Sequence, residues 1–254
     1  MTGWPGAAEL VNGQGTAPVV LVCEHASAFI PADLNDLGLD AADRHAHAVW
    51  DIGARDMAVA LAEALDAPLV AGALSRLVYD CNRPPSAHDS VPEASELISA
   101  PGNHGLSDAE RARRVAVHDQ FHKTVAQVLD RAQTRHGDHV ALVTLHSFTP
   151  IYFGVRRGVE IGFLNDDDDR LALACCDVAR TDALGVVEQN APYGKVDGVT
   201  YTLAKHAIAR GIRNVMIEVR NDLIATPQEA QAMGLALARV LDTALARTAD
   251  EVAR

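Results

Sequence analysis

The sequence lacks the features that mark nucleic-acid-binding and membrane proteins. Its 34 acidic residues outnumber its 22 Lys and Arg residues, and the formal net charge is -12. This balance disfavours a nucleic-acid partner, because binding to a phosphate backbone relies on Lys and Arg. The sequence also contains no run of about 18 apolar residues and no basic segment followed by an apolar stretch at the N-terminus. We therefore expect a cytoplasmic protein with no membrane partner.

Cysteine and aromatic residues are also scarce. The four cysteines, Cys23, Cys81, Cys175 and Cys176, are too few and too irregularly spaced for a disulfide framework or a CxxC zinc site. We expect them to be buried packing residues. Aromatic residues make up only 4% of the chain, whereas Ala and Leu are frequent, a composition typical of helices packed on a sheet.

Apolar strand-like runs alternate with helical patterns along most of the chain. The sequence predicts strands over 19–22, 68–72, 76–82, 139–146, 159–164, 186–189 and 214–219, and helices over 41–65, 107–135, 168–183, 200–210 and 227–247. Such alternation predicts an α/β fold of three layers, α/β/α, with a mixed and mostly parallel sheet. We expect a single domain over residues 1–254, of which residues 1–16 form a loosely ordered lead-in. Residues 84–105 lack any periodicity and are too long for a routine connection, so they are a candidate lid.

Two motifs match known metal sites only in part. His118 and His122 lie one helical turn apart, but no HExxH glutamate separates them. We expect one exposed histidine and one, His122, packed beneath a site. The acidic run Asp166–Asp169 lacks the alternating ligands and the glycine of a calcium loop, and its position favours the start of a helix.

Three apolar strands end in reactive polar side chains. VVLVCEH ends at His25, HVALVTLHSF contains His146, and NVMIEVRND contains Glu218. Burying such groups without partners costs free energy, so three together favour a shared site at the carboxyl ends of the strands. Two histidines and a carboxylate suit a hydrolytic Zn²⁺ with three protein ligands and one open position. A further glutamate would then act as a base. The alternative for Glu218 is an ion pair with Arg213 or Arg220.

The segment LSRLVYDCNRP contains a second group of polar residues. Arg76 and Arg83 each offer a planar fork of N–H donors that matches a carboxylate, and Asn82 supplies a further hydrogen bond. Asp80 lies between them. The alternative is a surface salt bridge for each arginine.

Several blocks together resemble a known family. VCEHASAFIP, VWDIGA, LSRLVYDCNRPP, FHKTV, LHSFTP, APYGKVDGVTYTLAKHA and EVRNDLI are similar, in this order, to the N-formylglutamate amidohydrolase family. The blocks extend from Val22 to about Ile224. The resemblance implies a zinc-carboxypeptidase-like (phosphorylase/hydrolase-like) fold and metal-dependent deacylation.

The resemblance also implies roles for particular residues. It implies that His25 and His146 are metal ligands and that Glu218 is the general base. It further implies that Asn82 and Arg83 bind a substrate carboxylate. The block containing Tyr193, Lys195 and His206 is expected to border the substrate.

The third metal ligand is not fixed by the resemblance. The wider carboxypeptidase and aspartoacylase group has HxxE at the first ligand site, whereas this chain has Ala28 three residues after His25. Asp51, in the VWDIGA block, is our first candidate. Glu24 is the second, because its side chain should point away from that of His25 in a regular strand, and His47 is the third.

These observations lead to an expected function. We expect a cytoplasmic amidohydrolase with one Zn²⁺, or another divalent ion, per chain, which removes a formyl or similar small acyl group from an amino-acid-like carboxylate. Glu218 is the expected catalytic base, and Arg76, Asn82 and Arg83 are expected to hold the carboxylate. The alternatives are a non-catalytic carboxylate-binding protein and a peptidase or peptidoglycan amidase on the same scaffold.

Overall fold

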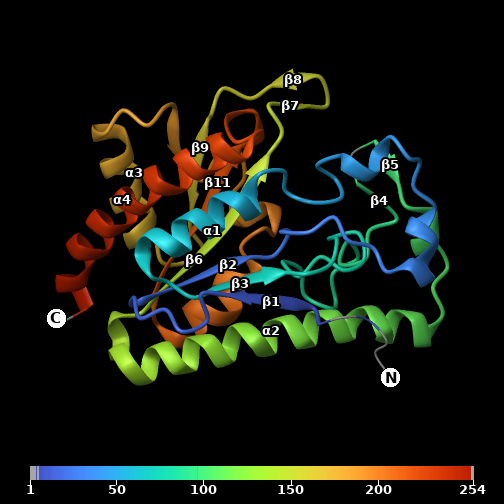
Figure 1. Ribbon diagram of the computed structural model, residues 1–254, viewed down its shortest axis with the longest axis horizontal. Helices are drawn as coiled ribbons and strands as arrows, with labels where there is room; N and C mark the ends of the chain where they lie inside the picture. The colour runs from blue at the N-terminus through green and yellow to red at the C-terminus, as the bar shows by residue number, and fades with distance from the viewer. Residues whose placement is uncertain (1–3, 5, 96, 253–254) are drawn as a thin grey trace.

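A seven-stranded sheet forms the centre of the molecule, and its strand order is β1-β3-β2-β6-β11-β9-β10 (Figure 1). This computed structural model describes residues 4, 6–95 and 97–252. The strands of the sheet are β1 Ala8–Val11, β2 Val19–Cys23, β3 Leu69–Gly72, β6 Ala141–Phe148, β9 Ile161–Leu164, β10 Val187–Gln189 and β11 Arg213–Arg220. The neighbours β3, β2, β6 and β11 run parallel, while β1 and β9 run antiparallel to β3 and β11. The sheet is therefore mixed and mostly parallel, as the sequence predicts.

Helices cover both faces of the sheet. They are α1 Ala54–Leu65, α2 Asp108–His136, α3 Arg170–Thr181 and α4 Pro227–Val252. Apolar residues of α1, α3 and α4 share one core with the sheet, and those of α2 share the other (Figure 1). This arrangement gives the expected α/β/α layers. Helices α1 and α4 approach closely at Gly234, where an added Cβ would lie 2.6 Å from the Met57 carbonyl oxygen.

Burial on both faces explains why the central strands have continuous apolar sequences. Every residue of β2 is buried, with Leu21 in the core beneath α1 and with Val20 and Val22 in the core beneath α2. The same alternation continues along β6 and β11, which pair over their full lengths. Polar residues at the carboxyl ends of these strands consequently meet at one edge of the sheet.

Two small hairpins and several short helical turns complete the chain. The hairpins are β4 Ala94–Ser95 with β5 Ile98–Ser99 and β7 Ile151–Tyr152 with β8 Val155–Arg156. The turns are Ala32–Gly38, Asp43–His45, Pro101–Asn103, Gly137–His139, Lys195–Asp197, Leu203–Ala207, Ile208–Arg210 and Asn221–Leu223. Among the described residues, none of the helices combines the length and the apolar character needed to cross a membrane.

Three predictions about secondary structure and chain order are wrong. Residues 76–82 form no strand but an irregular, mostly buried segment. Part of the N-terminal lead-in is ordered, because β1 pairs along its length with β3. The helix expected over 41–65 begins only at Ala54. The residues before it form turns, and these place Asp51 beside the carboxyl end of β2.

Other predictions are confirmed in detail. Ser107 and Glu110 form a capping box at the start of α2. All four cysteines are buried and free. His122 is buried as expected, but the expectation of an exposed histidine beside it is wrong, since His118 is buried too. The helix expected over 200–210 consists of a π turn followed by a 3-10 turn.

Candidate active site

The three strand-end side chains meet at the carboxyl edge of the sheet. Glu218 of β11 lies directly opposite His146 of β6 in the parallel register, so both side chains leave the same face. Strand β2 ends at Cys23, and Glu24 and His25 follow in a turn. Both of these residues are buried. Glu24 lies against His146, and His25 lies against Asp51.

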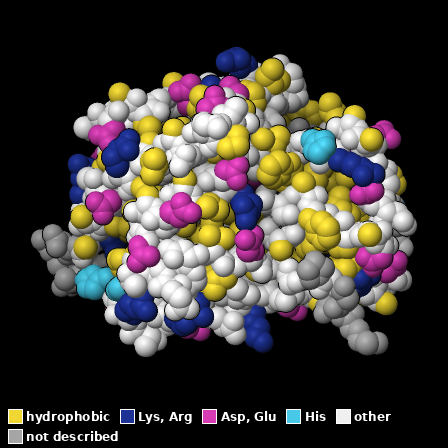
Figure 2. All heavy atoms as spheres, viewed as in Figure 1, with side chains coloured by type: hydrophobic (Ala, Val, Ile, Leu, Met, Phe, Trp, Pro, Cys, Tyr) yellow, Lys and Arg dark blue, Asp and Glu magenta, His cyan; other side chains and the backbone are white. Residues whose placement is uncertain are grey.

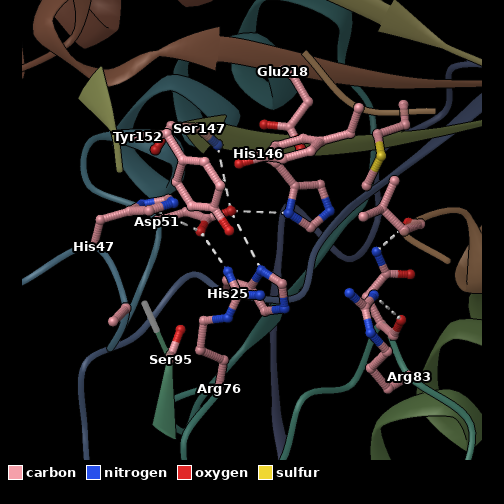
Figure 3. A pocket seen from close by; sticks show the side chains of 15 residues that line it. His25, His47, Asp51, Arg76, Arg83, Ser95, His146, Ser147, Tyr152 and Glu218 are labelled. Carbon is pink, nitrogen blue, oxygen red and sulfur yellow. Dashed lines mark hydrogen bonds and ion pairs between the residues drawn. The ribbon is translucent and has the colours of Figure 1, made fainter. Parts of the chain in front are cut away.

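Asp51 lies between the two histidines. Its backbone N–H donates to the His25 carbonyl over 3.0 Å, which ties the loop before α1 to the end of β2. Gly53 makes this loop possible, because its φ is +77° and an added Cβ would lie 2.2 Å from the Ile224 carbonyl oxygen. Asp51 Oδ2 lies 2.9 Å from His146 Nδ1 and 3.4 Å from His25 Nδ1 (Figure 3).

The donor set suits a divalent metal ion. His25, Asp51 and His146 each offer one ligand atom, and these atoms all lie within 4.8 Å of one another. Atoms bound at zinc distances in a tetrahedral site lie about 3.3 Å apart. The two nitrogen-to-oxygen distances of 2.9 and 3.4 Å bracket that spacing. Two imidazoles and one carboxylate leave a fourth position open, as in hydrolytic zinc sites.

Carboxylates lie against the other nitrogens of both histidines. Asp80 Oδ1 is 2.8 Å from His25 Nε2. Glu24 Oε2 is 3.1 Å from His146 Nε2, although the two groups lack the alignment of a hydrogen bond. Glu24, the second candidate for the third ligand, thus faces Nε2 of His146, whereas Asp51 faces Nδ1 of the same ring. The third candidate, His47, has its Nδ1 3.7 Å from Asp51 Oδ1, and burial lowers its pKa to about 4.

The cluster is rich in negative charge. Four buried carboxyl groups surround the two histidines: Glu24, Asp51, Asp80 and Glu218. Among the described residues, Arg76 is the guanidinium that pairs with this group, at 3.3 Å from Asp51 and 3.1 Å from Asp80. Burial would raise the pKa of Asp51, but His25 and His146 hold it well below its usual range. A bound divalent cation would balance this charge.

Among these four carboxyl groups, Glu218 is the one whose pKa is raised rather than lowered. Its Oε2 is buried and has no hydrogen-bond partner among the residues that the structure describes. Burial raises the pKa of Glu218 to about 7, a value suited to proton transfer near neutral pH. The ion-pair alternative is not observed for Arg220, which pairs with Glu160 and Asp222. Arg213 lies at the opposite end of β11, where it donates to the Leu245 and His139 carbonyls.

A cavity of ≈ 170 Å³ joins the metal-ligand candidates to the predicted substrate-binding residues. It is lined by His25, His47, Ala48, Asp51, Arg76, Asn82, Arg83, Ser95, His146, Ser147, Tyr152, Tyr193, Val199, Met216 and Glu218 (Figure 3). Ser95 belongs to the long 84–105 loop, so this candidate lid contributes to the cavity wall.

The predicted carboxylate-binding residues are already engaged with the protein. Asn82 donates to the Val199 carbonyl and accepts from the Thr202 N–H. Its side-chain amide therefore links the segment 76–82 to the segment that contains Val199 and Thr202. The Nε of Arg83 donates to Asp89 over 2.8 Å, and its Nη1 donates to the carbonyls of Asn82 and Gly198. The roles of these residues in binding substrate stay predictions.

Two of the predicted substrate-bordering residues lie outside the cavity lining. Lys195 is half exposed and pairs with Asp166 and Asp167. His206 is buried, and its Nε2 lies 2.8 Å from His122 Nδ1. The other nitrogen of His122 lies 2.8 Å from the Cys81 carbonyl oxygen, so these histidines support the segment that contains Asp80 and Asn82.

The sequence reasoning missed the contribution of the β7–β8 hairpin. Tyr152 of β7 lines the cavity, and Arg157, just after β8, donates to the Tyr193 hydroxyl over 2.7 Å. No motif marks residues 151–157 as functional. The signal available in the sequence is Gly154, a residue that favours turns, and it indicates a turn without indicating a site.

Comparisons with known proteins identify the fold and the family of the chain. A crystal structure of a gene product from Agrobacterium tumefaciens is 45% identical, covers 96% of each chain and superposes with a TM-score of 0.91. The fold also matches that of an N-formylglutamate amidohydrolase from Ralstonia eutropha JMP134, at 20% identity and a TM-score of 0.64 over 98% of this chain and 99% of the other. No curated protein matches the sequence. The N-formylglutamate amidohydrolase family model matches residues 17–225, and the chain therefore belongs to this family.

Proposed function

We propose that the protein is a metal-dependent amidohydrolase that removes a formyl group from a small N-formyl amino acid, with N-formylglutamate as the leading candidate. The observation that carries the proposal is that one cavity contains both the three metal-ligand candidates, His25, Asp51 and His146, and Glu218. Among the described residues, Oε2 of Glu218 has no hydrogen-bond partner. Membership of the family supports the same reaction class.

The proposed metal ligands are His25 and His146, through their Nδ1 atoms, and Asp51. A divalent ion bound there supplies Lewis acidity, which polarises a substrate carbonyl and lowers the pKa of a bound water. Ser147 supports the site from the protein side, because its backbone N–H lies 3.3 Å from Asp51 Oδ2 and its hydroxyl donates to the Ile52 carbonyl over 2.8 Å. These contacts fix the Asp51 carboxylate in place before any ligand binds.

Glu218 moves the protons in this proposal. Its carboxylate accepts a proton from the attacking water while the water oxygen forms a bond to the formyl carbon. As the C–N bond breaks, Glu218 returns the proton to the leaving nitrogen, and formate and the free amine result. A pKa of about 7 lets the same group act first as base and then as acid.

The cavity favours a small substrate over a peptide. Its volume of ≈ 170 Å³ suits a few heavy atoms beyond the amide, and the 84–105 loop forms part of its wall. Arg83, one of the residues that line the cavity, would provide a positive charge for the carboxylate of an amino acid. The peptidase and peptidoglycan amidase alternatives call for an open groove. The alternative of a binding protein gives no reason for a buried, unpartnered carboxyl group beside the metal-ligand candidates.

A substrate panel tests the proposed function. Purified, zinc-supplemented protein should hydrolyse N-formyl amino acids faster than N-acetyl amino acids, and it should leave peptides and peptidoglycan fragments intact. Release of formate and of free amine measures turnover. Preferential cleavage of peptides would favour the peptidase alternative, and tight binding of carboxylates without any turnover would favour the binding protein.

Asp80 provides a prediction about metal affinity. Its carboxylate accepts from His25 Nε2, so we expect it to orient the imidazole and hold the proton on the nitrogen that faces away from Asp51. Changing Asp80→Asn should weaken zinc binding by about 10- to 100-fold, as measured by competition with a chromogenic chelator. Asp89→Asn is the matched control, because Asp89 pairs with Arg83 away from the histidines. Equal zinc affinity of both variants and the unchanged protein would contradict this role.

A further inference from the structure

Three histidines are buried outside the group of proposed metal ligands. They are His118, His122 and His206, and each is at most 4% exposed. In keeping with this burial, Figure 2 shows few histidine side chains on the face of the molecule that it presents. A buried polar group costs free energy unless it is hydrogen-bonded. The partners of His122 and His206 therefore indicate what these two rings do in the fold.

The partners of His122 and His206 determine which ring nitrogens carry the protons. His122 Nε2 lies 2.8 Å from the Cys81 carbonyl oxygen, and because a carbonyl only accepts, this nitrogen carries a proton. Burial lowers the pKa of His122 to about 3 and that of His206 to about 4, so both rings are neutral at pH 7. His122 Nδ1 is then an acceptor, and Nε2 of His206 donates to it over 2.8 Å.

The outer end of this series agrees with the assignment. His206 Nδ1 is left as an acceptor, and Nη1 of Arg210, which can only donate, lies 3.5 Å from it. Arg210 also pairs with Asp130 of α2. His206 belongs to the π turn Leu203–Ala207, a rare conformation that is frequent at functional sites. The donors therefore all point inward, from Arg210 to the Cys81 carbonyl.

The inner end of the series holds one peptide unit. The Cys81 carbonyl and the Asn82 N–H belong to the same planar peptide unit. His122 donates to the carbonyl, and the N–H donates to Asp80 Oδ1 over 2.9 Å. The same carboxylate oxygen lies 2.8 Å from His25 Nε2. The orientation of this peptide unit consequently affects where the oxygen that faces His25 lies.

We propose that His122 and His206 are positioning residues for the metal site. They hold the Cys81–Asn82 peptide unit in the orientation that lets Asp80 fix the ring of His25. Hydrogen bonds in series also polarise one another, so a donor at the carbonyl strengthens the N–H donor of the same peptide unit. This inference rests on the proposed function and extends its metal site to α2 and to the π turn. In this role His206 acts from behind the site and does not touch the substrate.

Two amide substitutions at His122 test the proposal. The side-chain nitrogen of Gln lies as many bonds from Cα as imidazole Nε2, so His122→Gln can keep the hydrogen bond to the Cys81 carbonyl. The side-chain nitrogen of Asn corresponds to Nδ1, so His122→Asn loses that bond. We expect His122→Asn to weaken zinc binding by about 10-fold and His122→Gln to weaken it by less than about 3-fold, as measured by chelator competition. Equal losses in the two variants would mean that His122 contributes packing only, and would overturn the inference.

His118→Asn is the matched control. His118 is equally buried on α2, one turn before His122, but its ring nitrogens contact Asp119 and the Tyr201 hydroxyl. This variant should bind zinc as tightly as the unchanged protein, and a loss equal to that in His122→Asn would overturn the inference.

A double variant tests the route through Asp80. Once Asp80→Asn has interrupted the series, adding His122→Asn should weaken zinc binding by less than about 2-fold further. Fully additive losses would show that His122 acts by another route, and would contradict the proposed positioning role.

Nitrogen NMR of isotope-labelled histidines separates this inference from the proposed function, because it needs neither zinc nor turnover. In metal-free protein we expect the proton on Nε2 of both His122 and His206. The His25 signals should shift in His122→Asn but not in His118→Asn. These results would support the inference even if no N-formyl compound is hydrolysed. A proton on Nδ1 of His122, or unchanged His25 signals in His122→Asn, would contradict it even if hydrolysis is fast.

Discussion

Replacing Glu218 by Gln is expected to lower kcat by about 10²- to 10⁴-fold while substrate affinity and metal content survive. Gln keeps the volume of the side chain and most of its hydrogen-bonding capacity, but it cannot accept a proton. Because Glu218 is buried and its Oε2 has no hydrogen-bond partner among the described residues, the substitution breaks no known hydrogen bond of that atom. Steady-state kinetics and elemental analysis of the same preparation provide the measurement.

The control for this substitution is Glu188→Gln, at an exposed position of strand β10. It removes the same charge far from the cavity lining and should leave kcat unchanged. A Glu218→Gln enzyme with lower thermal stability and nearly normal kcat would show that Glu218 is a structural residue. The base would then have to be assigned elsewhere, and the binding-protein alternative would regain support.

Replacing His146 by Ala is expected to abolish zinc binding and, with it, measurable turnover. The substitution removes one of three ligands and leaves Asp51 without the imidazole that lies 2.9 Å from its Oδ2. His25→Ala should have the same effect for the same reason. Zinc content after gel filtration measures the loss, and His88→Ala, at an exposed position of the 84–105 loop, is the control.

The double variant His25→Ala with His146→Ala gives the strictest form of this experiment. Asp51 alone would be left of the three candidates, and a single carboxylate cannot hold a zinc ion tightly at neutral pH. Full zinc occupancy in a folded double variant would mean that the metal binds at other residues. Circular dichroism and thermal melting establish whether each variant is folded.

Much of the site is visible in the sequence because strand ends are local features. An apolar run that turns abruptly polar predicts both a strand and its carboxyl end, and this pattern predicts His25, His146 and Glu218 as site residues. The structure brings these three together in one cavity. Asp51 has no such local signal, since a helical pattern surrounds it, and only the family resemblance made it a candidate.

The segment 76–82 could not be predicted from its sequence. Leu77, Val78 and Tyr79 have the apolar and aromatic character of a strand, yet distant side chains satisfy the backbone of the segment. Asn103 donates to the Leu77 carbonyl, Arg114 of α2 donates to the Val78 carbonyl, and His122 contacts the Cys81 carbonyl. A buried backbone needs hydrogen bonds, but nothing local reveals that side chains provide them.

The same limit explains why the sequence does not indicate the contacts of Arg157 and Asp80. Both residues contact partners that lie far away in the sequence, Tyr193 for Arg157 and His25 for Asp80. The error at β1 has a similar origin. The strand has only four residues, and it forms by pairing with β3, a long-range contact that the composition of residues 1–16 does not indicate.

The most direct test of the proposed chemistry is the release of formate from N-formyl-L-glutamate as zinc is titrated into chelator-treated, metal-free protein. We expect negligible turnover without metal, a linear rise with added zinc, and a plateau at about one equivalent per chain, as a three-ligand site implies. Full activity in protein shown by elemental analysis to contain no metal would contradict metal-dependent deformylation, as would the absence of formate at saturating zinc.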